Sequence, residues 1–113
     1  MPIRIGFSQH RSMLLKSELE RVAQELPSLG ALKVIAIGDL PRGRVLPGSI
    51  LQLIVVQDLA LNYLDRIDFF ISHLRPLVGI DISVYTSSEF AELEKTNLFV
   101  MSSLRNGWAM YEE

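Results

Sequence analysis

Two arginines in a segment rich in glycine and proline are the first residues of this chain that could do chemistry. Arg42 and Arg44 flank Gly43, and residues 38–50 contain too many turn-forming residues for a long helix or strand. Guanidinium groups on such a loop can bind an anion such as phosphate through charge-assisted hydrogen bonds, without a metal ion. The alternative is that both arginines are solvated surface charges, and the sequence leaves this open.

Other reactive residue types form no recognisable constellation. The two histidines, His10 and His73, have no Cys, Asp or Glu at a usual metal-ligand spacing. No serine stands in a Gly-x-Ser-x-Gly context, and the chain contains no cysteine. The sequence therefore predicts neither a familiar zinc site nor a nucleophilic triad. Since nothing requires an oxidising compartment, a cytoplasmic location is the default expectation.

Three short apolar segments are predicted to be strands, because they are rich in β-branched residues and bounded by turn signals. They are residues 31–37, 51–56 and 80–85. The alternation of Ile3, Ile5 and Phe7 with polar or small residues predicts a further short strand near the N-terminus.

Four amphipathic segments that could position the loop and the strands are predicted to be helices. They are residues 10–26, 61–78, 88–95 and 97–106. Leucine and valine side chains form one face of the first helix, so Glu18 and Arg21 are expected on the opposite, solvated side. Arg66 is likewise expected on the solvated face of the second helix. The alternation of strands and helices predicts an α/β (α+β) domain in which helices pack on a small sheet.

Size and composition describe one globular domain spanning residues 1–113. Hydrophobic residues make up 49% of the 113 residues, and the mean hydropathy is +0.26. A domain this small cannot cover so much apolar surface by itself, so a homo-oligomer or a protein partner is expected. The net charge of −2 does not favour nucleic acid as a partner, and no apolar stretch has the length of a membrane span.

Residues 34–56 read VIAIGDLPRGRVLPGSILQLIVV. This segment resembles the signature of minimal nucleotidyltransferases (MNT domains) of the DNA polymerase beta superfamily. In that family an apolar strand ends in Gly-Ser, and a basic turn leads to Ser-Asp-x-Asp on the next strand. The resemblance continues in GIDISVYTSSEFAEL (residues 79–93) and in the closing GWAMYEE. It implies a nucleotidyltransferase-like fold with a small mixed sheet of three to four strands packed against helices.

The resemblance also implies where a nucleotide site would lie. In the family, the Gly-Ser pair approaches the nucleotide phosphates. Gly38 matches the glycine, Asp39 replaces the serine, and Ser49 matches the serine before the two aspartates. The residues thus implied for a nucleotide or anion site are Gly38, Arg42, Gly43, Arg44 and Ser49.

The metal-binding positions of the family are altered in this chain. Ile50 and Gln52 occupy the positions of the two strand aspartates, and Asp81 matches the third carboxylate. Magnesium prefers carboxylate oxygens, which the first two residues lack. Asp81 is therefore the one remaining metal candidate, and we predict no catalytic residue and no metal cofactor. Magnesium would be needed only if Asp39 and Asp81 form a rearranged pair at the ends of neighbouring strands.

These departures predict a degenerate domain, a pseudoenzyme that acts through protein association. Minimal domains of this family resemble one half of two-gene modules whose other half is a helical HEPN-type protein, in a toxin–antitoxin arrangement. One alternative is a nucleotide or phosphate sensor that binds through Gly38, Arg42 and Arg44. Another is an active transferase with a rearranged metal site built on the two aspartates.

Overall fold

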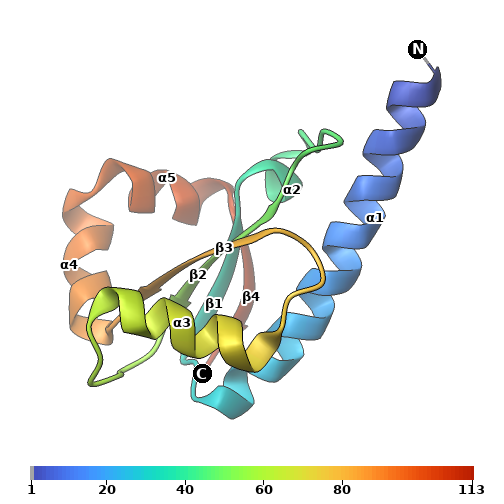
Figure 1. Ribbon diagram of the computed structural model, residues 1–113. Helices are drawn as coiled ribbons and strands as arrows, with labels where there is room; N and C mark the ends of the chain where they lie inside the picture. The colour runs from blue at the N-terminus through green and yellow to red at the C-terminus, as the bar shows by residue number, and fades with distance from the viewer. Residues whose placement is uncertain (1) are drawn as a thin grey trace.

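A four-stranded mixed sheet lies at the centre of the protein, in a computed structural model that describes residues 2–113 (Figure 1). The strands are β1 (Lys33–Ile37), β2 (Leu51–Val56), β3 (Ile80–Tyr85) and β4 (Trp108–Glu112). Their order in the sheet is β3-β2-β1-β4, with β1 antiparallel to both neighbours and β2 parallel to β3. The expected α+β architecture and small mixed sheet are confirmed.

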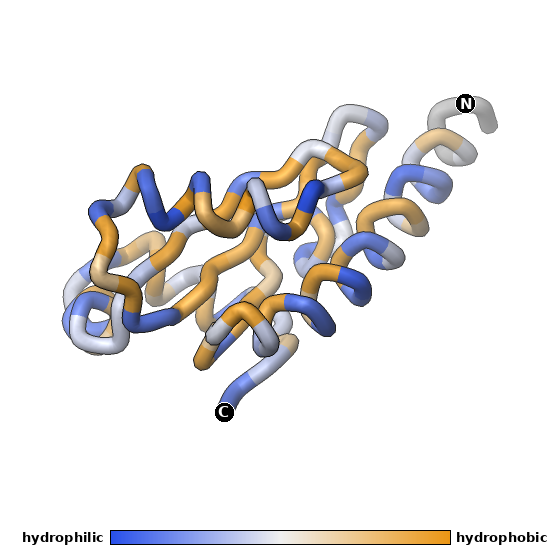
Figure 2. The backbone as a smooth tube through the Cα atoms, turned by 60° about the horizontal axis from the view of Figure 1, so that its bottom comes forward, coloured by the Kyte–Doolittle hydropathy of each residue, from blue (hydrophilic) through white to orange (hydrophobic). Residues whose placement is uncertain are grey.

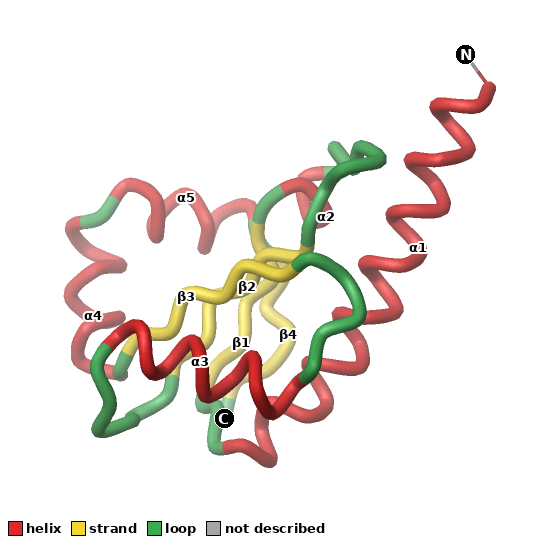
Figure 3. Tube along the Cα trace, in the orientation of Figure 1, coloured by secondary structure: helices red, strands yellow, loops and turns green. Residues whose placement is uncertain are grey.

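Helices cover both faces of this sheet (Figure 3). They are α1 (Pro2–Glu25) with the 3-10 turn η1 (Leu26–Leu29), α2 (Asp39–Arg42), α3 (Tyr63–Leu74), α4 (Ser87–Thr96) and α5 (Leu98–Asn106). None of the helices within residues 2–113 combines the length and the hydrophobicity that crossing a membrane requires.

Strand alternation divides the core into two layers. Val34, Leu53 and Val84 point to the face covered by α1 and α3, where they pack in one apolar cluster with Leu19 and Phe70. The residues of opposite parity point to α4 and α5 in a second cluster, which consists of Ile35, Ile37, Ile54, Val56, Phe90 and Val100. Figure 2 shows apolar residues along the strands and alternating apolar and hydrophilic turns in the helices, as expected for helices with one buried face.

The predicted boundaries differ from the observed ones mainly near the N-terminus. α1 begins at Pro2, so the strand predicted at residues 3–7 is wrong. Extending an existing helix adds one hydrogen bond per residue, whereas a short strand needs another strand to pair with. The N-terminal half of α1 projects beyond the sheet as a result (Figure 1).

The second predicted helix, residues 61–78, is longer than the observed α3. Asn62 caps its N-terminus by accepting a hydrogen bond from the Asp65 N–H. At the other end, Arg75 adopts a left-handed conformation (φ 47°) directly before Pro76. A residue before proline is sterically disfavoured in the helical region, so the helix ends there.

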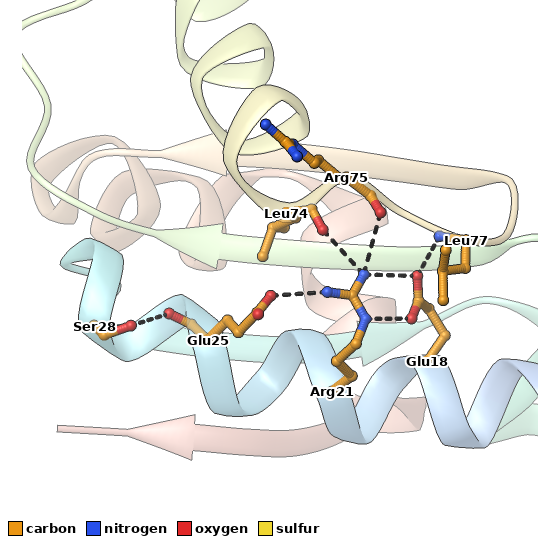
Figure 4. Close-up of polar contacts among 7 residues, drawn as sticks. All are labelled: Glu18, Arg21, Glu25, Ser28, Leu74, Arg75 and Leu77. Atoms are coloured by element: carbon orange, nitrogen blue, oxygen red, sulfur yellow. Dashed lines mark hydrogen bonds and ion pairs between the residues drawn. The ribbon is translucent and has the colours of Figure 1, made fainter.

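Two charged residues of α1 hold the end of α3 and the connection that follows it (Figure 4). Arg21 donates to the Leu74 carbonyl (3.0 Å) and forms a two-pronged ion pair with Glu18 at 2.7 and 2.9 Å. Glu18 also accepts the backbone N–H of Leu77, and it is only 4% exposed. The expectation that Glu18 faces solvent is therefore wrong, whereas Arg21 is partly exposed. The last carbonyls of a helix lack partners within the helix, and α1 supplies a donor for one of them.

Arg66 is also buried, contrary to the expectation of a solvated side chain. Its guanidinium donates to the Leu61 carbonyl (2.8 Å) and pairs with Glu89 at the start of α4 (2.7 Å). Glu89 in turn completes a capping box with Thr86. The ion pair therefore links α3 to α4.

Candidate functional site

The turn from β1 into α2 brings the backbone close to the neighbouring strand. Gly38 has φ 82° and ψ −146°, a conformation that is essentially restricted to glycine. Its neighbour across the sheet is the side chain of Gln52, which stands opposite Ile37 in the antiparallel register. A Cβ atom placed on Gly38 would lie 1.8 Å from the Gln52 Oε1. A glycine is therefore required by both the conformation and the close approach.

A cleft of about 320 Å³ opens at this turn, between α2, the start of β2 and α5. It brings together five residues that the sequence singled out: Gly38, Asp39, Arg42, Arg44 and Gln52. The opposite wall comes from α5, which supplies Phe99, Ser102, Ser103 and Asn106. Figure 1 shows α5 returning toward the β1–α2 turn before the chain enters β4.

Asp39 lines the cleft and is also engaged in a structural contact. Its carboxylate accepts a hydrogen bond from the Ser49 hydroxyl at 2.7 Å. The same hydroxyl accepts the Leu46 N–H (2.9 Å), and Arg11 of α1 donates to the Ser49 carbonyl (2.7 Å). Ser49 is buried and does not line the cleft, because these contacts use it to fasten the loop before β2.

The arginines lie at the rim of the cleft. Arg42 is exposed and donates to the Ser102 hydroxyl of α5 at 3.1 Å. Arg44 is also exposed and lines the same cleft. Gly43, between them, ends α2 in a left-handed conformation and lies outside the cleft, in a hollow lined also by Trp108. The arrangement could hold an anion through two guanidinium groups and the polar residues of α5.

The three positions matched to metal carboxylates lie on one face of β2 and β3. Gln52 and Asp81 are direct neighbours in the parallel register, and Ile50 precedes them on the same side. Ile50 packs against Gly79, where an added Cβ would lie 2.8 Å from its Cγ2. Within residues 2–113 no three His, Cys, Asp or Glu residues are grouped closely enough to hold a metal ion.

The rearranged pair expected from the sequence would have Asp39 and Asp81 at the ends of neighbouring strands. β2 lies between β1 and β3 in the sheet, and Asp81 does not line the cleft that contains Asp39. The strand that leads to Asp39 and the strand that carries Asp81 are therefore not neighbours, and the residue beside Asp81 is Gln52, a neutral amide.

No protein-family model matches the chain, and no curated protein sequence matches it either. Among solved structures, the chain is similar to a candidate nucleotidyltransferase from Sulfolobus solfataricus. The two chains share 20% identity with a TM-score of 0.55, over 96% of this chain and 86% of the other. The fold is nucleotidyltransferase-like. At this level of identity the similarity shows the fold alone, and the chemistry has to be argued from the residues.

In this nucleotidyltransferase-like fold, the polar residues of α5 are the part of the cleft that sequence reasoning missed. Ser102, Ser103 and Asn106 recur at helical spacing, which is the pattern of any solvated helix face. Their position at the cleft depends on β4, which returns the chain to the edge of β1. No local pattern in the sequence predicts that β4 pairs with β1 and so places α5 at the cleft.

Replacing Gly38 with alanine is expected to lower the free energy of unfolding by about 1–3 kcal/mol, because the new side chain must adopt a glycine-only conformation. Gly43→Ala is the matched control. It also changes a glycine with positive φ (70°), but nothing lies within 4 Å of the added Cβ. Its cost is expected to be about 1 kcal/mol. Urea unfolding measures both values, and equal losses would contradict the requirement for a glycine-only conformation at position 38.

Proposed function

We propose that this chain is a non-catalytic nucleotidyltransferase-fold domain that acts by associating with another protein. The observation that carries the proposal is the identity of the residues at the three former metal positions. Ile50 has no ligand atom, Gln52 is neutral and lies against Gly38, and only Asp81 keeps a carboxylate. A single carboxylate holds a hydrated magnesium ion weakly, and nucleotidyl transfer depends on such ions to neutralise the triphosphate.

Exposed apolar side chains support the association half of the proposal. Several large ones are more than half exposed in the isolated chain: Phe7, Met13, Leu46, Leu64, Leu77, Leu98 and Phe99. Exposed apolar side chains indicate an association surface where they lie close together, and Leu98 and Phe99 are adjacent at the start of α5. The likeness to minimal nucleotidyltransferases adds one kind of partner, a helical HEPN-type protein in a toxin–antitoxin pair.

A labelling experiment tests the absence of catalysis. The purified chain is incubated with magnesium and α-labelled ATP, GTP or CTP, alone and together with the product of the neighbouring gene. We expect no incorporation of label into either protein, and we expect the two proteins to elute as one complex in gel filtration. Magnesium-dependent labelling that disappears in the Asp81→Ala variant would show that the domain is an enzyme.

The cleft itself supports a second candidate function, the binding of a nucleotide or phosphate without a metal ion. Two exposed guanidinium groups, Arg42 and Arg44, share it with the hydroxyl of Ser102 and the amide of Asn106. NMR titration with ATP or inorganic phosphate in EDTA is expected to shift the amide signals of these residues. The Arg42→Gln/Arg44→Gln variant should lose the shifts, whereas Arg105→Gln, which changes an exposed arginine outside the cleft, should keep them.

A further inference from the structure

The charges of this chain are separated between its two ends. Residues 2–17, the first two-thirds of α1 and including its projecting half, contain Arg4, Arg11 and Lys16 and no acidic residue. α4 carries Glu89, Glu92 and Glu94, with Lys95 as its one basic residue. Figure 1 shows α4 at the side of the molecule opposite to the N-terminus of α1. The small net charge therefore conceals a basic end and an acidic end.

The basic end also presents apolar side chains to solvent. Phe7 is 58% exposed and Leu14 is 41% exposed. They are seven residues apart, which is two helical turns, so they share one face of α1. Arg11 lies between them on this face, where its Nε donates to the Ser49 carbonyl and its two terminal nitrogens have no hydrogen-bond partner among the described residues. A projecting helix with this combination of residues is suited to entering an apolar groove with an acidic rim.

The acidic end contains such a groove, which we call the tyrosine groove. Tyr63 at the start of α3, Tyr85 at the end of β3 and Leu93 of α4 form its walls, around a volume of about 350 Å³. The centroids of the two tyrosine rings are 6.1 Å apart. Glu89 and Glu92 line the groove as well. Glu89 is paired with Arg66, and among the described residues Glu92 forms no ion pair, so Glu92 carries the uncompensated charge.

We propose that the projecting half of α1 of one copy docks into the tyrosine groove of the next copy. Phe7 packs against the exposed surfaces of the two tyrosine rings and Leu93, and the basic residues of the helix face Glu92. Association of two projecting helices with each other is disfavoured, because it would bring their like charges together. The interface is therefore head-to-tail, so that it joins copies into a ring or an open chain. This inference rests on the proposed function insofar as both assign the domain to protein association.

Sedimentation equilibrium over a range of protein concentrations tests the proposal. The mass of the wild-type chain is expected to rise above that of a monomer with concentration, and roughly tenfold weaker association is expected at high salt. Phe7→Asp and Tyr63→Asp should each remain monomeric. An equimolar mixture of the two variants should form a dimer and no larger species, because one retains the groove and the other retains the helix.

Two controls show whether the loss of association is specific to this interface. Leu104→Asp, which adds the same charge at an exposed leucine of α5 outside the groove, should associate like the wild type. Circular dichroism should show that both monomeric variants are folded. A wild-type chain that stays monomeric, a mixture that stays monomeric, or a Tyr63→Asp variant that associates normally would overturn the proposal.

The head-to-tail interface and the non-catalytic role can fail separately. A chain that is monomeric but shows no magnesium-dependent labelling overturns the head-to-tail interface and leaves the non-catalytic role standing. A chain that transfers label but assembles as described overturns the non-catalytic role and leaves the interface standing.

Discussion

Replacing Glu18 with alanine is expected to lower the free energy of unfolding by about 2–4 kcal/mol, which is a large share of the stability of a small domain. The Glu18 side chain is 4% exposed and accepts both the Arg21 guanidinium and the Leu77 N–H. The variant leaves that N–H without its acceptor and the guanidinium without its counter-ion. Because Arg21 is one-third exposed and can be partly solvated, the expected loss lies below that of a fully buried pair.

Glu20→Ala is the matched control for this prediction, since Glu20 is an exposed glutamate of the same helix. Its effect should stay within about 0.5 kcal/mol. The hydrogen bond from Arg21 lowers the pKa of Glu18, so the contribution of Glu18 is present above the unfolded-state value and is lost as the pH falls through the folded-state value. The stability of the wild type should therefore fall more steeply in acid than that of Glu18→Ala. Equal losses for Glu18→Ala and Glu20→Ala would contradict the account.

The second large effect is a gain of metal binding when carboxylates are placed at the two positions matched to the strand aspartates of nucleotidyltransferases. The double variant Ile50→Asp/Gln52→Asp should bind Mn²⁺ with a Kd on the order of 10⁻⁴–10⁻³ M, as expected for a solvent-exposed carboxylate site. Strand alternation places both new carboxylates on one face, next to Asp81 in the parallel register. Electron paramagnetic resonance of free Mn²⁺ measures the binding, and a rise in Tm on adding the metal supports it.

The wild type and the triple variant that also carries Asp81→Asn are the controls for restored binding. Both are expected to bind Mn²⁺ at least roughly tenfold more weakly than the double variant, because each lacks carboxylates of the site. A folded double variant that binds no Mn²⁺ would show that positions 50 and 52 do not correspond to the metal positions of the nucleotidyltransferase-like fold. Binding that survives the loss of Asp81 would argue against that residue as a ligand.

Much of the fold could be predicted from local patterns. The strands at residues 51–56 and 80–85 have the observed boundaries, because continuous apolar or alternating runs between turn residues leave little choice. β4 had no such signal, since Trp108, Met110 and Tyr111 suit a contact surface or a core as well as a strand. Its pairing with β1 is a long-range contact that local reasoning does not reach.

The burial of polar residues could not be predicted from local patterns either. Glu18 and Arg66 have the spacing of a solvated helix face, and only the packing of α1 against the end of α3, and of α3 against α4, buries them. In the candidate site, the likeness of the β1–α2 turn to a known signature placed Gly38, Arg42 and Gln52 near one another. The likeness did not reveal that Ser49 stabilises the loop before β2. The hydrogen bond from Ser49 to Asp39 depends on the three-dimensional path of residues 43–50.

Thermal unfolding of the wild-type chain with ATP, GTP or CTP, each with and without Mg²⁺, tests the central claim most directly. A ligand that binds only the folded state raises its Tm, so a working metal–nucleotide site would show itself as a magnesium-dependent shift. Because Ile50 and Gln52 leave Asp81 as the only carboxylate at the three positions matched to the metal ligands of nucleotidyltransferases, magnesium is expected to add nothing to the Tm with any nucleotide. A magnesium-dependent rise in Tm that is abolished by Asp81→Asn would contradict the account and identify the domain as a functional nucleotide-binding enzyme.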